Sequence, residues 1–406
     1  MAKRFVSPSP DERQRILAGK RRLKMARSAH AYVRGATHKF YEWLEASGAR
    51  GLPEGPAIWI CGDCHLGNLG PVASASGDVG IQIRDLDQAV IGNPAHDLIR
   101  LGLSLATAAR GSDLPGVTTA KMLEEMMAGY QDALSSDEGD ATAAPPRPKA
   151  IQLLMRRAEG RRWRKLAKER IGREDARIPI GKRFWKLNGD ERAEIDAVFA
   201  TEDVRGMVTA LKSRADDAPV EILDAAYWMK GCSSLGRLRF AVLAGIGADA
   251  GSPAERCLID IKEAVSPAAP RAQGATMPRG AAERVIAGAR ALSPYLGERM
   301  RAGHLQGKAV VLRELMPQDL KLDIETLSCA EAMLAAHYLG SVVGEAHGRQ
   351  MDQATRAAWR DELHRRWPKG LDAPFWLWSS VVDLVGTHET AYLEHCRRYA
   401  LDAEAA

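Results

Sequence analysis

The chain has 406 residues, of which 46% are hydrophobic and 27% are charged, and its formal net charge is +5. This length and apolar content suit a globular protein with one large core or two moderate ones, compatible with two or three domains. No apolar stretch follows the basic N-terminal residues, and no later segment approaches the roughly 20 apolar residues of a spanning helix, so we expect a cytoplasmic protein without a secretory signal or membrane span.

The first 62 residues are predicted to be mainly helical, in "DERQRILAGKRRLKMARS" and "ATHKFYEWLEAS". Arg34, in "YVRG", stands at the end of a predicted helix. An arginine in this position is commonly a capping or ion-pair residue, and it is also a candidate for contact with a substrate or a phosphate.

The next segment contains Cys61, Cys64 and His65 in the C-x-x-C-H spacing of c-type haem attachment. That attachment belongs to exported proteins, and a zinc site would need a second Cys/His pair at a useful spacing. Six cysteines scattered along the chain fit reduced thiols better than a disulfide framework. We therefore expect Cys61 and Cys64 to be small buried side chains.

Polar residues in the same region point to a different chemistry. The apolar "AIWIC" and the alternating "VGIQIR" predict two short strands that pair with each other across the turn-rich "GPVASASGD". Two loops beside these strands carry Asp63 with Asn68, and Asp85 with Asp87. Carboxylate and amide oxygens of this kind suit Mg²⁺, which also takes phosphate oxygens and water.

These loops resemble a known family. "GDCHLGN" followed by "IRDLDQAVIGNPAHDLIRL" is similar to the catalytic and metal loops of aminoglycoside-phosphotransferase-like kinases, members of the protein-kinase-like superfamily. The resemblance implies that Asp63 is the catalytic aspartate, that Asn68 and Asp85 bind Mg²⁺, and that Asp87 is a second acidic metal position. Asp97, in the first turn of the following predicted helix, is expected to be structural, and His65 to fix the loop through its ring hydrogen bonds or to contact substrate.

Residues 147–186 contain 15 Lys or Arg residues against four Asp or Glu residues. A solvated basic face is the simplest interpretation. A clamp for an acidic or phosphorylated substrate and a contact with nucleic acid are the functional alternatives. Nucleic acid ranks lower because the sequence shows no recognisable nucleic-acid-binding module.

A nucleotide-binding lobe is expected after the catalytic loop rather than before it. "WMKGCSSLGRLRFAVLAGI" looks like a glycine-rich phosphate loop, and "ERCLIDIKEAV" looks like the strand whose lysine holds the α- and β-phosphates. The helix-like "PRGAAERVIAGARAL" would supply an ion-pair partner for that lysine, and "KAVVLRELMP" resembles the last strand and hinge, whose backbone would bond adenine. The nucleotide-binding residues implied in this way are Gly231, Ser233, Ser234, Gly236, Lys262, Glu283, Glu314 and Met316.

The predicted fold is therefore an α+β, protein-kinase-like, two-lobe fold in circularly permuted order, with a helix-rich larger lobe. Residues 1–215 would form the helical catalytic lobe, with the catalytic and metal loops at 58–97. Residues 216–318 would form the β-rich nucleotide lobe, and residues 319–406 the helices that complete the catalytic lobe. This order of segments resembles an uncharacterised bacterial family known only as a domain of unknown function.

The function implied by the resemblance is Mg·ATP-dependent phosphoryl transfer to a hydroxyl of an unidentified small molecule, and the basic segment favours an acidic substrate over nucleic acid. A nucleotide-binding regulator without transfer activity, and a nucleotidyl (AMP) transferase that uses the same site, are the alternatives. ATP and Mg²⁺ are the expected cofactors, whereas the acceptor and the oligomeric state stay open.

Overall fold

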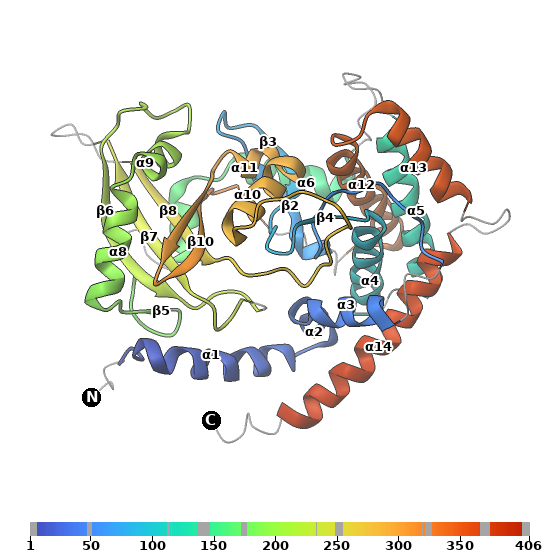
Figure 1. Ribbon diagram of the computed structural model, residues 1–406, viewed down its shortest axis with the longest axis horizontal. Helices are drawn as coiled ribbons and strands as arrows, with labels where there is room; N and C mark the ends of the chain where they lie inside the picture. The colour runs from blue at the N-terminus through green and yellow to red at the C-terminus, as the bar shows by residue number, and fades with distance from the viewer. Residues whose placement is uncertain are drawn as a thin grey trace.

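The computed structural model describes residues 6–46, 51–111, 114, 116–135, 147–171, 177–232, 234–247, 255–318, 320, 327–365 and 374–399. In these residues one part of the molecule is built around a large sheet and the other is mainly helical (Figure 1). The predicted α+β class is confirmed at this level.

The large sheet is antiparallel, with six strands in the order β5-β6-β7-β8-β10-β9. β6, β7 and β8 form a meander, after which the chain crosses through two helices and returns as the β9/β10 hairpin, with β10 paired to β8. The strands are β5 (Phe184–Trp185), β6 (Val220–Trp228), β7 (Arg239–Ile246), β8 (Glu255–Glu263), β9 (Met300–Leu305) and β10 (Lys308–Leu315). The crossing helices are α10 (Ala281–Leu292) and α11 (Pro294–Gly297).

Because side chains alternate along a strand, the sheet has two faces with different coverings. On the outer face, Phe240 and Val242 of β7 join a core with helices α8 (Gly189–Phe199) and α9 (Glu202–Thr209). On the inner face, Ala241 and Leu243 join a smaller core to which helix α7 (Trp163–Arg170) contributes.

The predicted lobe boundary at residue 215 divides elements that pack together. Strand β5 and helices α8 and α9 precede that boundary, yet they belong to the sheet or cover its outer face. Helix α1 (Pro10–Met25) also reaches the sheet, since its Leu17 lies in the outer-face core (Figure 1). The reason is that the apolar outer face needs a covering layer, which the chain supplies before it forms the main strands.

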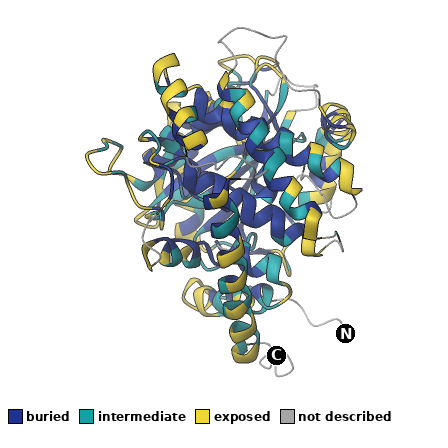
Figure 2. Ribbon diagram, turned by 90° about the vertical axis from the view of Figure 1, so that its right-hand side faces the viewer, coloured by how far each residue is buried: buried dark blue, intermediate teal, exposed yellow. Residues whose placement is uncertain are grey.

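The helical part is centred on the closely packed helices α5 and α12. Gly129 of α5 and Gly340 of α12 allow a close approach, because a Cβ at either position would lie 2.0 Å from a backbone oxygen of the facing helix. Buried residues fill the interior of the molecule, and exposed residues gather at its periphery (Figure 2). The helices of this part are α2 (Ala29–Gly35), α3 (Thr37–Ala46), α4 (Ala95–Gly111), α5 (Gly116–Ser135), α6 (Lys149–Glu159), α12 (Cys329–Gly348), α13 (Gln353–Arg365) and α14 (Phe375–Tyr399).

Two short ladders carry the loops predicted to be functional. β1 (Ile58–Ile60) pairs with β4 (Val90–Gly92), and β2 (Leu69–Ala73) pairs with β3 (Val79–Ile83). The predicted pairing of β1 with β3 is therefore wrong. The tight turn after β2, in which the Ser74 hydroxyl accepts the N–H groups of Ser76 and Asp78 at 3.1 Å each, pairs β3 with its immediate neighbour instead.

Candidate functional site

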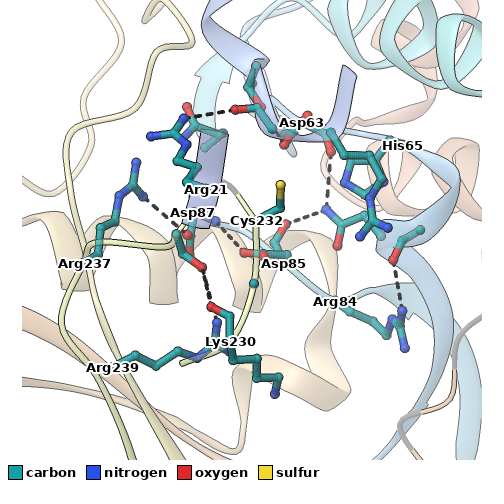
Figure 3. A pocket seen from close by; sticks show the side chains of 18 of the residues that line it. Arg21, Asp63, His65, Arg84, Asp85, Asp87, Lys230, Cys232, Arg237 and Arg239 are labelled. Carbon is teal, nitrogen blue, oxygen red and sulfur yellow. Dashed lines mark hydrogen bonds and ion pairs between the residues drawn. The ribbon is translucent and has the colours of Figure 1, made fainter. Parts of the chain in front are cut away.

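A cavity of about 510 Å³ lies where the inner face of the sheet meets the loops after β1 and β3. This volume lies within the range of small-molecule sites, roughly 300–1,000 Å³. Its lining combines the predicted Asp63, Asn68 and Asp85 with residues more than 140 positions away, including Gly231 and Ser234. Figure 3 shows Asp63, Asp85 and Asp87 together with arginine and lysine side chains from other elements.

The loop after β1 is anchored by Asp97, in the first turn of α4. The fully buried Asp97 carboxylate accepts the backbone N–H groups of Cys61 at 2.7 Å and Gly62 at 2.9 Å. His347 of α12, also fully buried, lies 3.3 Å from the same carboxylate. Asp97 thus orients the loop and does not line the cavity, in agreement with the structural role predicted for it.

Glycine is needed at position 62, between this anchor and Asp63. Its φ of +70° lies in the left-handed region, and a Cβ there would be 2.3 Å from the backbone oxygen of Gln88. The buried Cys61 and Cys64 beside it are small core side chains, as predicted.

Asp63 is held by a cation and a hydroxyl. Its Oδ1 pairs with the guanidinium of Arg100, which is fully buried in α4, and its Oδ2 accepts the hydroxyl of Thr37 at 2.9 Å. These two partners fix the carboxylate while 16% of the side chain stays exposed toward the cavity. A hydroxyl that enters the cavity can therefore reach a preoriented carboxylate acceptor.

Asn68 and Asp85 are joined directly. The buried Asn68 amide donates its Nδ2 hydrogen to the backbone oxygen of Asp85 at 2.7 Å, which orients its Oδ1 as the group left for a ligand. No group of three His, Cys, Asp or Glu side chains among the described residues could hold a metal ion by itself. Mg²⁺ does not require such a group, because it keeps several waters and uses phosphate oxygens.

Lys262 links the sheet to these acidic loops. Its Nζ lies 2.5 Å from Asp87 and 3.1 Å from Asp85, although 175 or more residues separate the lysine from both. Partial burial raises the pKa of Asp85, but the positive charges of Lys262 and Arg313 outweigh it, and the pKa lies below its ordinary value. Burial and the negative charge of Asp85 raise the pKa of Asp87. The ammonium group thus sits among the oxygens that a divalent cation would use.

Further cations surround the buried Asp260, which shares the inner face of the sheet with Lys262. Arg239 pairs with Asp260 at 2.5 Å, and Lys230 and Arg313 lie 3.5 and 3.8 Å from it. Burial lowers the pKa of Lys230 well below its ordinary value, against the effect of Asp260, and the Lys230 ammonium lies 3.9 Å from the Trp228 ring centre. Even without a charge on Lys230, one carboxylate for the two arginines leaves a positive surplus at this wall of the cavity.

The predicted glycine-rich loop connects β6 to β7, and the structure places part of it at the cavity. Gly231, with φ of +94°, and Ser234 line the cavity, whereas Gly236, with φ of +98°, does not. The Ser234 hydroxyl lies 3.4 Å from Arg239. Ser233 lies outside the described residues.

Glu283 does not fill its predicted role. Lys262 pairs with Asp85 and Asp87, while Glu283 lines a second cavity with Arg290 and Arg301. The residue of α10 that faces the acidic loop is instead the buried Arg284, which donates to the backbone oxygens of Ala89, Asp87 and Val265. Adjacent helix positions point in directions about 100° apart, so this register turns Glu283 away from the cavity.

The hinge role of Glu314 stays a prediction, but its side chain and backbone oxygen both have partners. Its buried side chain forms an ion pair with Arg214 at 2.8 Å, and its backbone oxygen accepts from Arg299 at 2.9 Å and is thereby engaged. Met316 packs against Ala73 and Leu211, and Leu315, not Met316, lines the cavity.

His65 and Arg34 both line the cavity. The predicted fixing of the loop by His65 is not seen at Nδ1, which is buried without a hydrogen-bond partner, and burial lowers the pKa of His65 to about 3. The guanidinium carbon of Arg34 would lie 3.1 Å from a Cβ at Gly67, so Arg34 packs on the loop that carries Asp63. Its Nε is buried and has no partner.

The basic segment 147–186 presents a solvated basic face, as its simplest interpretation predicted, because among its described Lys and Arg residues only Arg161 is buried and Arg170 half-buried. Of its described residues only Arg170 lines the cavity. Leu166, Ile171 and Ile178 pack on the inner face of the sheet, and Arg161 donates to the backbone oxygen of Pro317 at 2.5 Å. This segment therefore covers part of the sheet through its apolar residues. Residues 172–176 lie outside the described part.

Several residues of the site carry no motif that marks them. Nine Lys or Arg side chains and three Asp side chains line the cavity. The cations that sequence patterns missed include Arg21, Lys24, Arg84, Arg237 and Arg313. The only signal for the first two was the basic run "GKRRLKM", which reads equally well as the exposed face of a helix.

Comparison with known proteins gives a family without an activity. No curated protein and no solved structure matches the chain. Among the described helices, none is both long and apolar enough to cross a membrane. The model of a family described as uncharacterized protein conserved in bacteria, DUF2252, matches residues 13–398. The chain belongs to this bacterial family, as the order of its segments predicted.

Proposed function

We propose that the protein is a permuted, protein-kinase-like enzyme that transfers the γ-phosphoryl group of Mg·ATP to a hydroxyl. The observation that carries the proposal is the contact of Lys262 with Asp85 and Asp87 at 3.1 and 2.5 Å. It brings the predicted phosphate-binding lysine of one half of the chain to the predicted metal-binding aspartates of the other half.

The residues present fit a magnesium ion and a nucleotide. Asp85, Asp87 and the Oδ1 of Asn68 offer oxygen ligands within one loop cluster, and the surplus of positive side chains suits phosphate groups. When bound, Mg²⁺ would neutralise phosphate charge as it develops in the transition state. Lys262 would then exchange its carboxylate partners for phosphate oxygens, with Gly231 and Ser234 beside them.

Asp63 would receive the proton of the attacking hydroxyl. Arg100 and Thr37 hold its two oxygens, so the group is oriented before the acceptor arrives. Catalysis of this type depends mainly on positioning and on charge.

A nucleotide-binding regulator is the second candidate, and one observation favours it. The Lys262 ammonium lies on the oxygens of Asp85 and Asp87 that a catalytic metal would use, which favours binding without transfer. Nucleotidyl transfer is a third use of the same site. It differs from phosphoryl transfer in that AMP, and not the γ-phosphoryl group, reaches the acceptor.

The test uses ATP labelled at the α or the γ position, with water as the acceptor, and compares wild type with Asp63→Asn. We expect Mg²⁺-dependent formation of ADP and phosphate. Asp63→Asn should reduce the rate about 10²- to 10⁴-fold while nucleotide affinity stays within twofold. Asp203→Asn, at an aspartate that is 70% exposed and remote from the cavity, is the matched control.

Each outcome separates the candidates. Formation of AMP and pyrophosphate would support nucleotidyl transfer, and nucleotide binding without turnover would support the regulator. A wild type that binds no nucleotide at any Mg²⁺ concentration would refute all three.

A further inference from the structure

The positive side chains of the cavity form two groups. One group lies on the sheet around Asp260. The other, which we call the α1/α2 cation cluster, consists of Arg21 and Lys24 of α1, Arg34 of α2, and Arg237 of the loop before β7. Figure 3 shows Arg21 and Arg237 on the same side of the cavity, near Cys232 and Asp87.

The members of the cluster are close enough to affect each other. Burial lowers the pKa of Arg21, and the positive charge of Arg237 adds to this effect. Burial raises the pKa of the Cys232 thiol, while the charges of Lys24, Arg21 and Arg34 oppose that rise. Three charges of the cluster thus act on one position of the glycine-rich loop, and the fourth, Arg237, acts on Arg21.

The cluster is not neutralised within the described part of the chain. Arg21 donates to the backbone oxygen of Gly35 at 3.0 Å and Lys24 to that of Gly231 at 2.6 Å, but a carbonyl group carries no charge. No carboxylate among the described residues forms an ion pair with Arg21, Lys24 or Arg34. Arg237 has only a weak contact with Asp87, at 3.8 Å. Converging cations without counter-charge are unfavourable unless an anion binds among them.

The cluster lies on the Asp63 side of the cavity. Arg34 packs on Gly67 of the loop that carries Asp63, and Thr37, two residues after α2, bonds Asp63 itself. His65, which is 7% exposed, adds a buried and unpartnered Nδ1 in the same loop. Lys262, by contrast, approaches the metal loop from the sheet. Two separate positive surfaces therefore serve two ligands, one on each side of the acidic residues.

We propose that the α1/α2 cation cluster binds the acceptor, and that the acceptor is a small molecule that already carries a phosphate group. This inference rests on the proposed function. The acceptor oxygen would form a bond to the γ-phosphorus while the bond from that phosphorus to the bridging oxygen of ADP breaks, and the hydroxyl proton passes to Asp63. The same charges would repel polycationic acceptors.

Inorganic phosphate is the probe, titrated by calorimetry into protein saturated with Mg²⁺ and a non-hydrolysable ATP analogue. We expect Arg21→Gln/Arg34→Gln to weaken phosphate binding at least tenfold and to leave affinity for the analogue within about twofold. Arg15→Gln, an exposed arginine of the same helix, should leave both affinities unchanged. Arg34→Lys should bind phosphate more tightly than Arg34→Gln, because it retains the charge.

The titration distinguishes failure of the acceptor assignment from failure of the proposed function. If the analogue binds but phosphate does not, or if the double variant binds phosphate as wild type does, the acceptor assignment is refuted and the kinase proposal stands. If the analogue does not bind, the titration is repeated without it. The cluster is then supported as an anion site if phosphate binding is lost in Arg21→Gln/Arg34→Gln and kept in Lys262→Ala. The reverse pattern refutes it.

Discussion

The variant Lys262→Met tests two roles of Lys262 separately. One is its contact with the carboxylates of Asp85 and Asp87, and the other is its proposed contact with phosphate. The ammonium lies 2.5 Å from Asp87 and 3.1 Å from Asp85, and only 15% of the lysine side chain is exposed. A hydrogen bond to a charged group contributes about 1.5–3 kcal/mol. Loss of one such bond to a phosphate oxygen should therefore weaken nucleotide binding about ten- to hundredfold.

Binding of Mg²⁺ without nucleotide should change in the opposite direction. In the wild type the ammonium competes for the oxygens of Asp85 and Asp87, whereas Lys262→Met leaves two carboxylates without their cation. We expect the affinity for Mg²⁺ alone to rise by about tenfold or more, since two adjacent carboxylates attract a divalent ion strongly.

Calorimetry of Mg²⁺ alone, and of a non-hydrolysable ATP analogue with Mg²⁺, measures both effects. Lys308→Met is the matched control, because Lys308 lies on neighbouring β10, is half exposed, and pairs with Glu263 only. If Lys262→Met shifts the affinities for Mg²⁺ alone and for the analogue in the same direction, competition between the lysine ammonium and Mg²⁺ is contradicted. An unchanged affinity for the analogue would show that Lys262 does not bind phosphate.

Three further predictions concern the support of the site and the stability of the fold. Asp97→Asn should lower the free energy of unfolding by about 2–5 kcal/mol, measured by urea denaturation, because it removes the charge that holds two backbone N–H groups; a loss below about 0.5 kcal/mol would show that the anchor is dispensable. Gly62→Ala should reduce both stability and nucleotide turnover, since the new Cβ would meet the Gln88 oxygen at 2.3 Å. Gly77→Ala is the control, because Gly77 also has a positive φ but a Cβ there would meet no other atom. Burial, helped by Arg100, lowers the pKa of His388 from its usual 6.5 to about 4, so the unfolded chain binds more protons between these values. His388 alone should therefore cost the wild type about 3 kcal/mol of stability as the pH falls from 7 to 4, with His388→Leu reducing the pH dependence by this amount and the exposed His304→Leu retaining it; equal pH profiles for wild type and His388→Leu would disprove the assignment.

The strands and helices were predictable where local patterns are strong. The meander with the Lys262 strand, the helix α10 and the last strand follow from runs of apolar residues bounded by glycine and polar turns. The pairing of the short strands was not predictable, because β2 consists of "LGPVA", in which glycine and proline indicate a turn. The lobe boundary at 215 was missed for another reason, since the covering of the outer face depends on which elements reach it in space.

The residues of the candidate site were also predictable only in part. Asp63, Asn68, Asp85 and Asp87 were singled out by the resemblance of two short loops to a known family, and the structure brings them to one cavity. Glu283 was expected at the cavity because any acidic residue in the first turn of α10 satisfies the sequence pattern, but the rotation of the helix presents Arg284 instead. Glu314 had no sequence signal of its ion pair, because Arg214 is 100 positions away.

The sequence by itself determined the acidic loops and the order of the elements, because both depend on residues within a few positions of each other. Only the tertiary structure decided that Lys262 reaches Asp85 and Asp87, and that Arg21, Lys24, Arg34 and Arg237 share one cavity. The physical reason is that charges interact across space, so that a basic helix reads as solvated until its neighbours are known.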